Sequence, residues 1–170
     1  QFMLQVLSDF ADVLDRQLII SVAAGLSTDS ISKMLGGYKN IVRAMPNTPA
    51  MIQKGATGLY ATDYINEADK TLAASVMAAS GLVSWVQQEE QLHAVTAVSG
   101  SAPAYFFYML EAMIEAAVEQ GLDRKQAAAL AMQTALGAAQ MAITSEEGPA
   151  ELRRKVTSPN GTTQAAIESL

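Results

Sequence analysis

The sequence has 170 residues, of which 50% are hydrophobic, 16% are charged and 6% are aromatic, and its formal net charge is -6. The length fits one domain of ordinary size or two small ones, and the apolar fraction is too high for a disordered chain. Because 11 Lys and Arg face 17 Asp and Glu, we expect no nucleic-acid binding. The chain has no cysteine and one histidine, so we expect no disulfide framework, thiolate nucleophile or metal site.

The sequence shows no targeting or membrane-spanning signal. Residues 1–7 contain neither a basic region nor a small-residue cleavage site, which argues against a signal peptide. Residues 126–145 carry no charge over about one membrane-spanning length, but alanine dominates them and glutamines interrupt them. We therefore expect no membrane span and a cytoplasmic location.

Residues 1–88 show the pattern of an α/β domain. Short β-rich runs are expected to form strands at residues 18–24, 40–45, 57–61 and 82–86. Helix-capping residues at 28–30 and 66–67 predict a helix after the first strand and another reaching about residue 79. Strands that alternate with helices favour a mostly parallel, doubly wound sheet.

Residues 89–170 are expected to form an all-α domain, because no further β-rich run occurs and alanine is abundant. Capping residues, prolines and glycines divide this part into predicted helices at residues 89–98, 101–120, 123–145, 149–155 and 162–170. The sequence thus predicts two domains, 1–88 and 89–170.

The two long predicted helices are unusually apolar. Residues 104–120 carry charge only at Glu111, Glu115 and Glu119, and residues 126–145 are apolar on nearly every side. A helix of this kind must be surrounded, and the helical domain is too small to surround two of them. An isologous dimer is the simplest solution, and enclosure of the helix by the α/β domain is the alternative.

Three segments combine turn residues with possible ligand-binding groups. Residues 43–49 follow a predicted strand and contain two prolines, so they could form a wall for a flat cofactor ring or only a rigid turn. Residues 98–103 could bind a small anion at a helix start or only cap that helix. The one histidine, His93, falls within a predicted helix among apolar residues, and we interpret it as structural.

The third segment, residues 156–163, carries four hydroxyl groups and an Asn-Gly pair before a helix. An Asn-Gly pair can turn backbone N–H groups into a concave nest, which suits a substrate carboxylate. Glu146, at the end of the long helix, could face the same pocket. A plain turn followed by a helix cap is the alternative interpretation.

Four sequence blocks resemble the pyrroline-5-carboxylate reductase family, in the order expected for that family and over essentially the whole chain. They are Ser-Val-Ala-Ala-Gly at 21–25, Arg-Ala-Met-Pro-Asn-Thr-Pro at 43–49, Ala-Val-Ser-Gly-Ser-Ala-Pro-Ala-Tyr at 97–105, and residues 149–170 with Val-Thr-Ser at 156–158 and Asn-Gly-Thr-Thr at 160–163.

The resemblance implies a Rossmann-type α/β domain, of which this chain holds the C-terminal part, followed by an all-α helical dimerisation domain. It further implies an oxidoreductase that reduces L-1-pyrroline-5-carboxylate to L-proline with NADPH or NADH, the last step of proline biosynthesis. The implied assembly is a homodimer, which can form larger rings, and the partner subunit shares the active site. The implied chemistry requires no metal.

Site residues carry over by motif. The resemblance places the cofactor at Ala23, Ala24, Met45, Pro46 and Asn47. It places the substrate at Glu146, Ser158, Asn160, Gly161, Thr162 and Thr163, with Thr163 as the catalytic residue.

Two features depart from the family pattern. The dinucleotide-binding G-x-G-x-x-G run does not occur before residue 18, so we expect about half of the Rossmann domain, and activity with it, to be missing from this chain. Lys155 stands where many members have asparagine, which puts a cofactor contact there in doubt. A 3-hydroxyacid dehydrogenase would need a lysine in residues 126–145, which have none, and a non-catalytic helical dimerisation or ligand-binding module remains the alternative.

Overall fold

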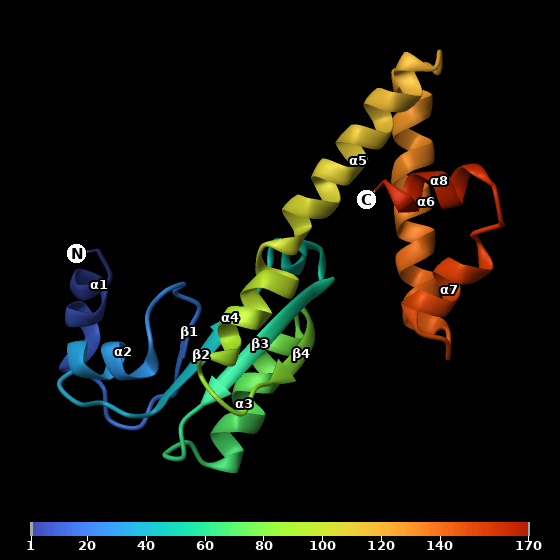
Figure 1. Ribbon diagram of the computed structural model, residues 1–170. Helices are drawn as coiled ribbons and strands as arrows, with labels where there is room; N and C mark the ends of the chain where they lie inside the picture. Colours follow the sequence, from blue (N-terminus) through green and yellow to red (C-terminus); the bar gives the residue numbers. More distant parts are fainter. Residues whose placement is uncertain (1, 170) are drawn as a thin grey trace. The chain divides into compact units, whose positions relative to one another are not determined.

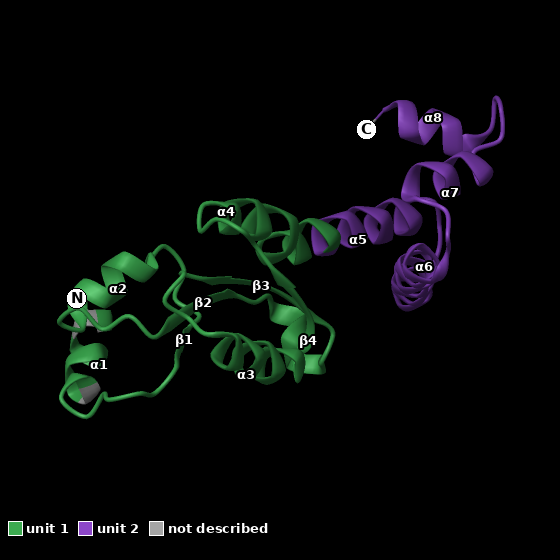
Figure 2. Cartoon of the chain, turned by 90° about the horizontal axis from the view of Figure 1, so that it is seen from below, with its two compact units in different colours: residues 1–106 green, residues 107–170 purple. Residues whose placement is uncertain are grey.

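The computed structural model describes residues 2–169 as two compact units (Figure 1). The first unit comprises residues 1–106 and the second residues 107–170 (Figure 2). This division differs from the predicted domain boundary at 88/89, because the segment after residue 88 packs on the sheet of the first unit. The domain boundary itself remains a prediction.

The first unit contains a four-stranded sheet in the order β1-β2-β3-β4. Its strands are β1 (Ile19–Ser21), β2 (Ile41–Met45), β3 (Gly55–Ala61) and β4 (Gly81–Trp85). All four predicted strands are therefore confirmed. The β1–β2 and β3–β4 pairs are parallel, and the β2–β3 pair is antiparallel.

Two of the three strand pairs are parallel, so the expectation of a mostly parallel sheet needs correction only at the antiparallel β2–β3 pair. Only η1 (Thr48–Ile52), a 3₁₀ turn with a proline near its start, lies between β2 and β3. A parallel connection needs a crossover of about a dozen residues or more, which residues 46–54 cannot supply. The chain therefore reverses direction, and the sheet is mixed.

The two faces of the sheet are covered by different helices. These are α1 (Phe2–Ala11), which the sequence did not reveal, α2 (Thr28–Met34), α3 (Glu67–Ala78), α4 (Gln91–Val95) and the π-helical turn η2 (Thr96–Gly100). Val42 and Ala44 of β2 pack in one core with Ala73 of α3. Ile41 packs in a second core with Ile31 of α2. Alternate residues of β2 thus serve opposite faces, as the pleat of a strand requires.

The second unit is helical, as predicted. It contains most of α5 (Ala102–Glu119), then α6 (Arg124–Thr144), α7 (Pro149–Lys155) and α8 (Thr162–Glu168). The Asp123 side chain caps α6 by accepting from the N–H groups of Lys125 and Gln126 at 3.0 and 3.2 Å. Arg124 binds both carboxylate oxygens of Glu115 at 2.7 Å, and this contact holds the end of α5 against the start of α6.

The helical unit buries very little of its apolar surface. Ala127 and Ala131 are its only buried residues among residues 107–169. Large apolar side chains on α5 and α6 are more than half exposed, including Phe107, Tyr108, Leu130, Met132, Leu136, Met141 and Ile143. Within residues 2–169, no helix combines the length and apolar character needed to cross a membrane.

The pairing of β3 with β4 begins at two glycines. Gly81 has a φ of +143°, and a Cβ atom there would lie 2.1 Å from the carbonyl oxygen of Gly55. We predict that Gly81→Ala lowers the free energy of unfolding by more than about 3 kcal/mol, because both the backbone angle and the backbone contact oppose a side chain. Urea unfolding of the chain measures this change.

Gly37→Ala is the matched control. Gly37 also has a positive φ, +99°, but a Cβ atom there meets nothing within 4 Å. Gly37→Ala should lower the free energy of unfolding by about 1 kcal/mol, from the backbone angle alone. Equal losses in the two variants would show that the close approach to Gly55 contributes nothing.

Candidate active site

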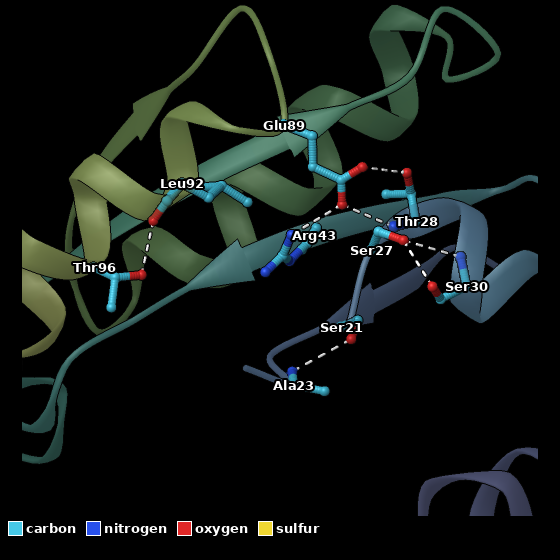
Figure 3. A network of polar contacts seen from close by, with 9 residues as sticks. All are labelled: Ser21, Ala23, Ser27, Thr28, Ser30, Arg43, Glu89, Leu92 and Thr96. Carbon is cyan, nitrogen blue, oxygen red and sulfur yellow. Dashed lines mark hydrogen bonds and ion pairs between the residues drawn. The ribbon is translucent and has the colours of Figure 1, made fainter. Parts of the chain in front are cut away.

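The carboxyl ends of β1 and β2 lie side by side and bring two predicted cofactor segments together. Ser21 and Arg43 pair in register in the parallel strands, so the segments that follow them leave the same edge of the sheet. Ala23 is half-buried and Ala24 is exposed at this edge. The Ala23 N–H donates to the Ser21 hydroxyl at 3.3 Å, which closes a tight turn (Figure 3).

The loop after β2 is fixed by the side chain of Asn47. Its Nδ2 donates to the Ser99 carbonyl at 3.1 Å, and its Oδ1 accepts from the Ala56 N–H at 2.8 Å. Met45 lies beside η2, where its Cε is 3.0 Å from the position of a Cβ on Gly100. Pro46 has no N–H to donate. The segment is therefore a stiff wall with few donors, whose polar Asn47 amide already has protein partners.

The predicted anion site at the start of α5 has a different structure from the one expected. The helix predicted to end at residue 98 continues as η2, and the Ser101 N–H donates to the Thr96 carbonyl at 2.7 Å. The hydroxyl groups of Thr96 and Ser99 donate to carbonyls four residues earlier, at 2.7 and 2.9 Å. These two hydroxyls therefore bond to the helix backbone, and both interpretations of residues 98–103, an anion site and a helix cap, remain predictions.

A polar network that the sequence did not reveal lies beside the cofactor segments (Figure 3). The Glu89 carboxylate accepts from the Thr28 N–H at 2.8 Å, from the Thr28 hydroxyl at 2.9 Å and from Arg43 Nη1 at 3.0 Å. The Arg43 and Glu89 side chains are 10% and 16% exposed. The sequence offered one signal for this network: Arg43 falls within an apolar strand, and a buried arginine needs an acidic partner. Spacing alone does not show whether that partner is Glu89 or Glu90.

The same network affects a neighbouring tyrosine. Tyr60 of β3 pairs in register with Arg43 of β2. Burial raises the pKa of Tyr60, and the nearby Glu89 carboxylate raises it further. Both effects keep the phenol neutral, so Tyr60 carries no charge at this edge.

The predicted substrate residues lie in the second unit, around the turn before α8. Asn160 adopts a left-handed conformation with φ 59°, and its N–H donates to Gln164 Oε1 at 2.9 Å. The Gly161 N–H donates to the Ser158 carbonyl at 3.1 Å, and a Cβ on Gly161 would lie 2.7 Å from Ser158 Oγ. A side chain at position 161 would therefore displace the Ser158 hydroxyl.

The two threonines form the first turn of α8, where backbone N–H groups have no partner within the helix. Thr162 is exposed and Thr163 is half-buried. The structure thus groups Ser158, Asn160, Gly161, Thr162 and Thr163 in one turn, and their binding roles remain predictions.

Glu146 lies apart from that turn in sequence, in the connection between α6 and α7. Its side chain is exposed, whereas the neighbouring Glu147 binds Lys155 Nζ with both oxygens, at 2.5 and 2.7 Å. Lys155 therefore has an acidic partner within its own unit. This ion pair joins the segment before α7 to the last residue of α7.

Two further expectations concern His93 and metal binding. His93 is exposed on α4, while the adjacent Leu92 is buried. Among residues 2–169, no three His, Asp or Glu side chains gather in a way that could hold a metal ion.

Comparison with known proteins gives one consistent match. The family described as pyrroline-5-carboxylate reductase dimerisation matches residues 89–170. The pyrroline-5-carboxylate reductase of Pseudomonas aeruginosa is 54% identical over 153 residues, which cover 90% of this chain and 56% of that protein. The chain therefore spans little more than half of this relative.

Solved structures extend the match to the fold. A pyrroline-5-carboxylate reductase from Coxiella burnetii has a TM-score of 0.90 and 46% identity, covering 98% of this chain and 63% of that one. The Plasmodium falciparum pyrroline carboxylate reductase, solved with NADP bound, has a TM-score of 0.90 and 30% identity, covering 99% of this chain and 67% of that one. Similarity in sequence and in fold across both units shows that the chain belongs to the pyrroline-5-carboxylate reductase family.

Proposed function

We propose that this chain is part of a reductase that converts L-1-pyrroline-5-carboxylate to L-proline in the cytoplasm, with NADPH or NADH as the hydride donor. The observation that carries the proposal is the 54% identity to one reductase over 90% of this chain. Both units therefore match a single enzyme. The Plasmodium falciparum relative with NADP bound supports a nicotinamide cofactor.

The cofactor segments fit the nicotinamide end of such a molecule. Ala23 and Ala24 follow β1, and Met45 and Pro46 lie at the end of β2, so four small or apolar residues meet at one sheet edge. Asn47 braces this wall by its contacts with Ser99 and Ala56. A bound reduced nicotinamide supplies the hydride, and the wall orients its ring and keeps water from it.

The turn before α8 fits the substrate. Backbone N–H groups at Thr162 and Thr163, in the first turn of α8, favour a carboxylate, and the hydroxyls of Ser158 and Thr163 add donors. Asn160 supplies the left-handed conformation that shapes the turn. The Glu146 carboxylate, exposed at the far end of α7, would contribute polarity to the pocket.

Thr163 is the residue that we assign to the substrate nitrogen. Thr163 follows Thr162 in the first turn of α8. Its hydroxyl can therefore bind the ring nitrogen while the backbone N–H groups of the same turn bind the carboxylate. Hydride transfer to an electrophilic imine carbon depends on such positioning more than on a nucleophile. The hydroxyl orients the nitrogen and helps it receive or hold a proton.

The active unit is a homodimer in this proposal. The apolar side chains of α5 and α6 are exposed within the unit, and the family that matches residues 89–170 is described by dimerisation. A second copy would cover these side chains and share the site. Rings of dimers are a further assembly that the resemblance allows.

Thr163→Ala in the full-length enzyme should lower kcat/KM for pyrroline-5-carboxylate by roughly 5- to 150-fold. The loss of one substrate hydrogen bond costs about 1–3 kcal/mol in transition-state binding. Steady-state oxidation of NADPH measures the change, with circular dichroism and light scattering as checks of fold and assembly.

Thr163→Ser is the matched control, because it keeps the hydroxyl and should retain much of the activity. The NADPH dissociation constant should be nearly constant in both variants, since the cofactor wall lies in the other unit. An alanine variant within about twofold of the parent would limit Thr163 to helix capping.

The 170-residue chain should form a dimer through residues 101–145 and have no reductase activity, because it lacks a pyrophosphate-binding G-x-G-x-x-G turn. Light scattering at micromolar concentration measures the first property, and NADPH oxidation the second. Leu136→Glu places a charge among the exposed apolar side chains of α6 and should yield monomers.

A monodisperse monomer of the parent chain would contradict the dimer proposal. Turnover by the chain alone would show that the glycine-rich turn is unnecessary. A full-length protein that dimerises without turnover would favour the alternative, a non-catalytic dimerisation module.

A further inference from the structure

We propose that Glu89 is a positioning residue that fixes the cofactor loop, residues 22–27, through the first turn of α2. This inference rests on the proposed function, because that function assigns Ala23 and Ala24 of the loop to the nicotinamide wall. Glu89 acts on the loop from a segment that is distant in sequence.

The loop is anchored at both ends. At its start, Ser21 belongs to β1 and its hydroxyl accepts from the Ala23 N–H at 3.3 Å. At its end, the Ser27 hydroxyl caps α2 by accepting from the Ser30 N–H at 3.1 Å. Thr28 follows directly, and it gives both its N–H and its hydroxyl to Glu89.

Glu89 itself is held firmly. Arg43 lies in β2, where its backbone pairs in register with β1 and β3 and its side chain reaches Glu89 Oε1. Leu92, three residues after Glu89, is 1% exposed and anchors α4 in the core. The carboxylate therefore connects the sheet, the start of α2 and the approach to α4 (Figure 3).

Glu89 is placed to act indirectly. Oε1 accepts from Thr28 and Arg43, and Oε2 accepts from the Thr28 hydroxyl, so both oxygens serve protein donors. Little of its side chain is exposed. Its loss would free the Thr28 end of the loop and leave a buried arginine without its acid partner. The expected defect is weaker cofactor binding, since the loop would have to be ordered by the cofactor itself.

The test compares Glu89→Gln with Glu90→Gln in the full-length enzyme. Glu90 is adjacent and exposed, so its variant removes the same charge without touching the network. We expect Glu89→Gln to raise the NADPH dissociation constant about five- to tenfold, measured by fluorescence titration without substrate. The KM for pyrroline-5-carboxylate at saturating NADPH should change by less than about twofold, and Glu90→Gln should match the parent in both.

Milder variants guard against a folding failure. Thr28→Val removes only the hydroxyl contact and should raise the NADPH dissociation constant about two- to fivefold, while Thr28→Ser should restore it. Amide hydrogen exchange of residues 22–28, without ligands, should be faster in Thr28→Val and in any folded Glu89→Gln protein than in Glu90→Gln.

Several outcomes overturn the inference. One is an unchanged NADPH dissociation constant in both Thr28→Val and folded Glu89→Gln. Another is a substrate KM that rises as much as the NADPH dissociation constant, because this would indicate a general loss of structure. If the parent shows no turnover, the proposed function fails, whereas cofactor binding and loop exchange in the variants still decide the role of Glu89.

Discussion

The deficit of buried apolar surface in the helical unit is the constraint on which the rest of this protein depends. Within residues 107–169 only two alanines are buried, while α5 and α6 expose aromatic, leucine and methionine side chains. Exposed apolar patches of this kind are costly in water and mark interaction surfaces. The small side chains of α6 also permit close approach of another helix. We therefore propose that self-association is part of what the unit requires to be stable, and not an addition to a finished domain.

The predicted site follows the same division of the chain. The proposed cofactor wall lies at a sheet edge in the first unit, where Asn47 bonds to Ser99 on one side and Glu89 bonds to Thr28 on the other. The proposed substrate turn lies in the second unit, where the Gly161 N–H donates to the Ser158 carbonyl. We propose that a dimer unites these two halves. Hydride transfer needs two flat partners held in a fixed relation, which stiff loops on packed elements can provide.

Local sequence patterns predicted most elements, because capping residues, glycines and apolar runs act over short distances. Asp123, Asn66 and Gly121 marked helix ends correctly. The antiparallel direction of β3 was missed because the pattern of a strand is independent of its direction, and α1 was missed for lack of a starting signal. Glu89 was missed because its partners Thr28 and Arg43 are distant in sequence. The resemblance supplied the site residues, and spacing alone left each segment with a structural alternative.

A crystal structure of the full-length enzyme with NADP⁺ and proline tests the central claim most directly. The account predicts the nicotinamide ring against Ala24 and Pro46, and the proline carboxylate at the N–H groups of the turn before α8. The wall and the turn should come from different subunits of a dimer whose α5 and α6 helices interlock. Proline bound away from Gly161–Thr163, or a site completed within a single monomer, would contradict it.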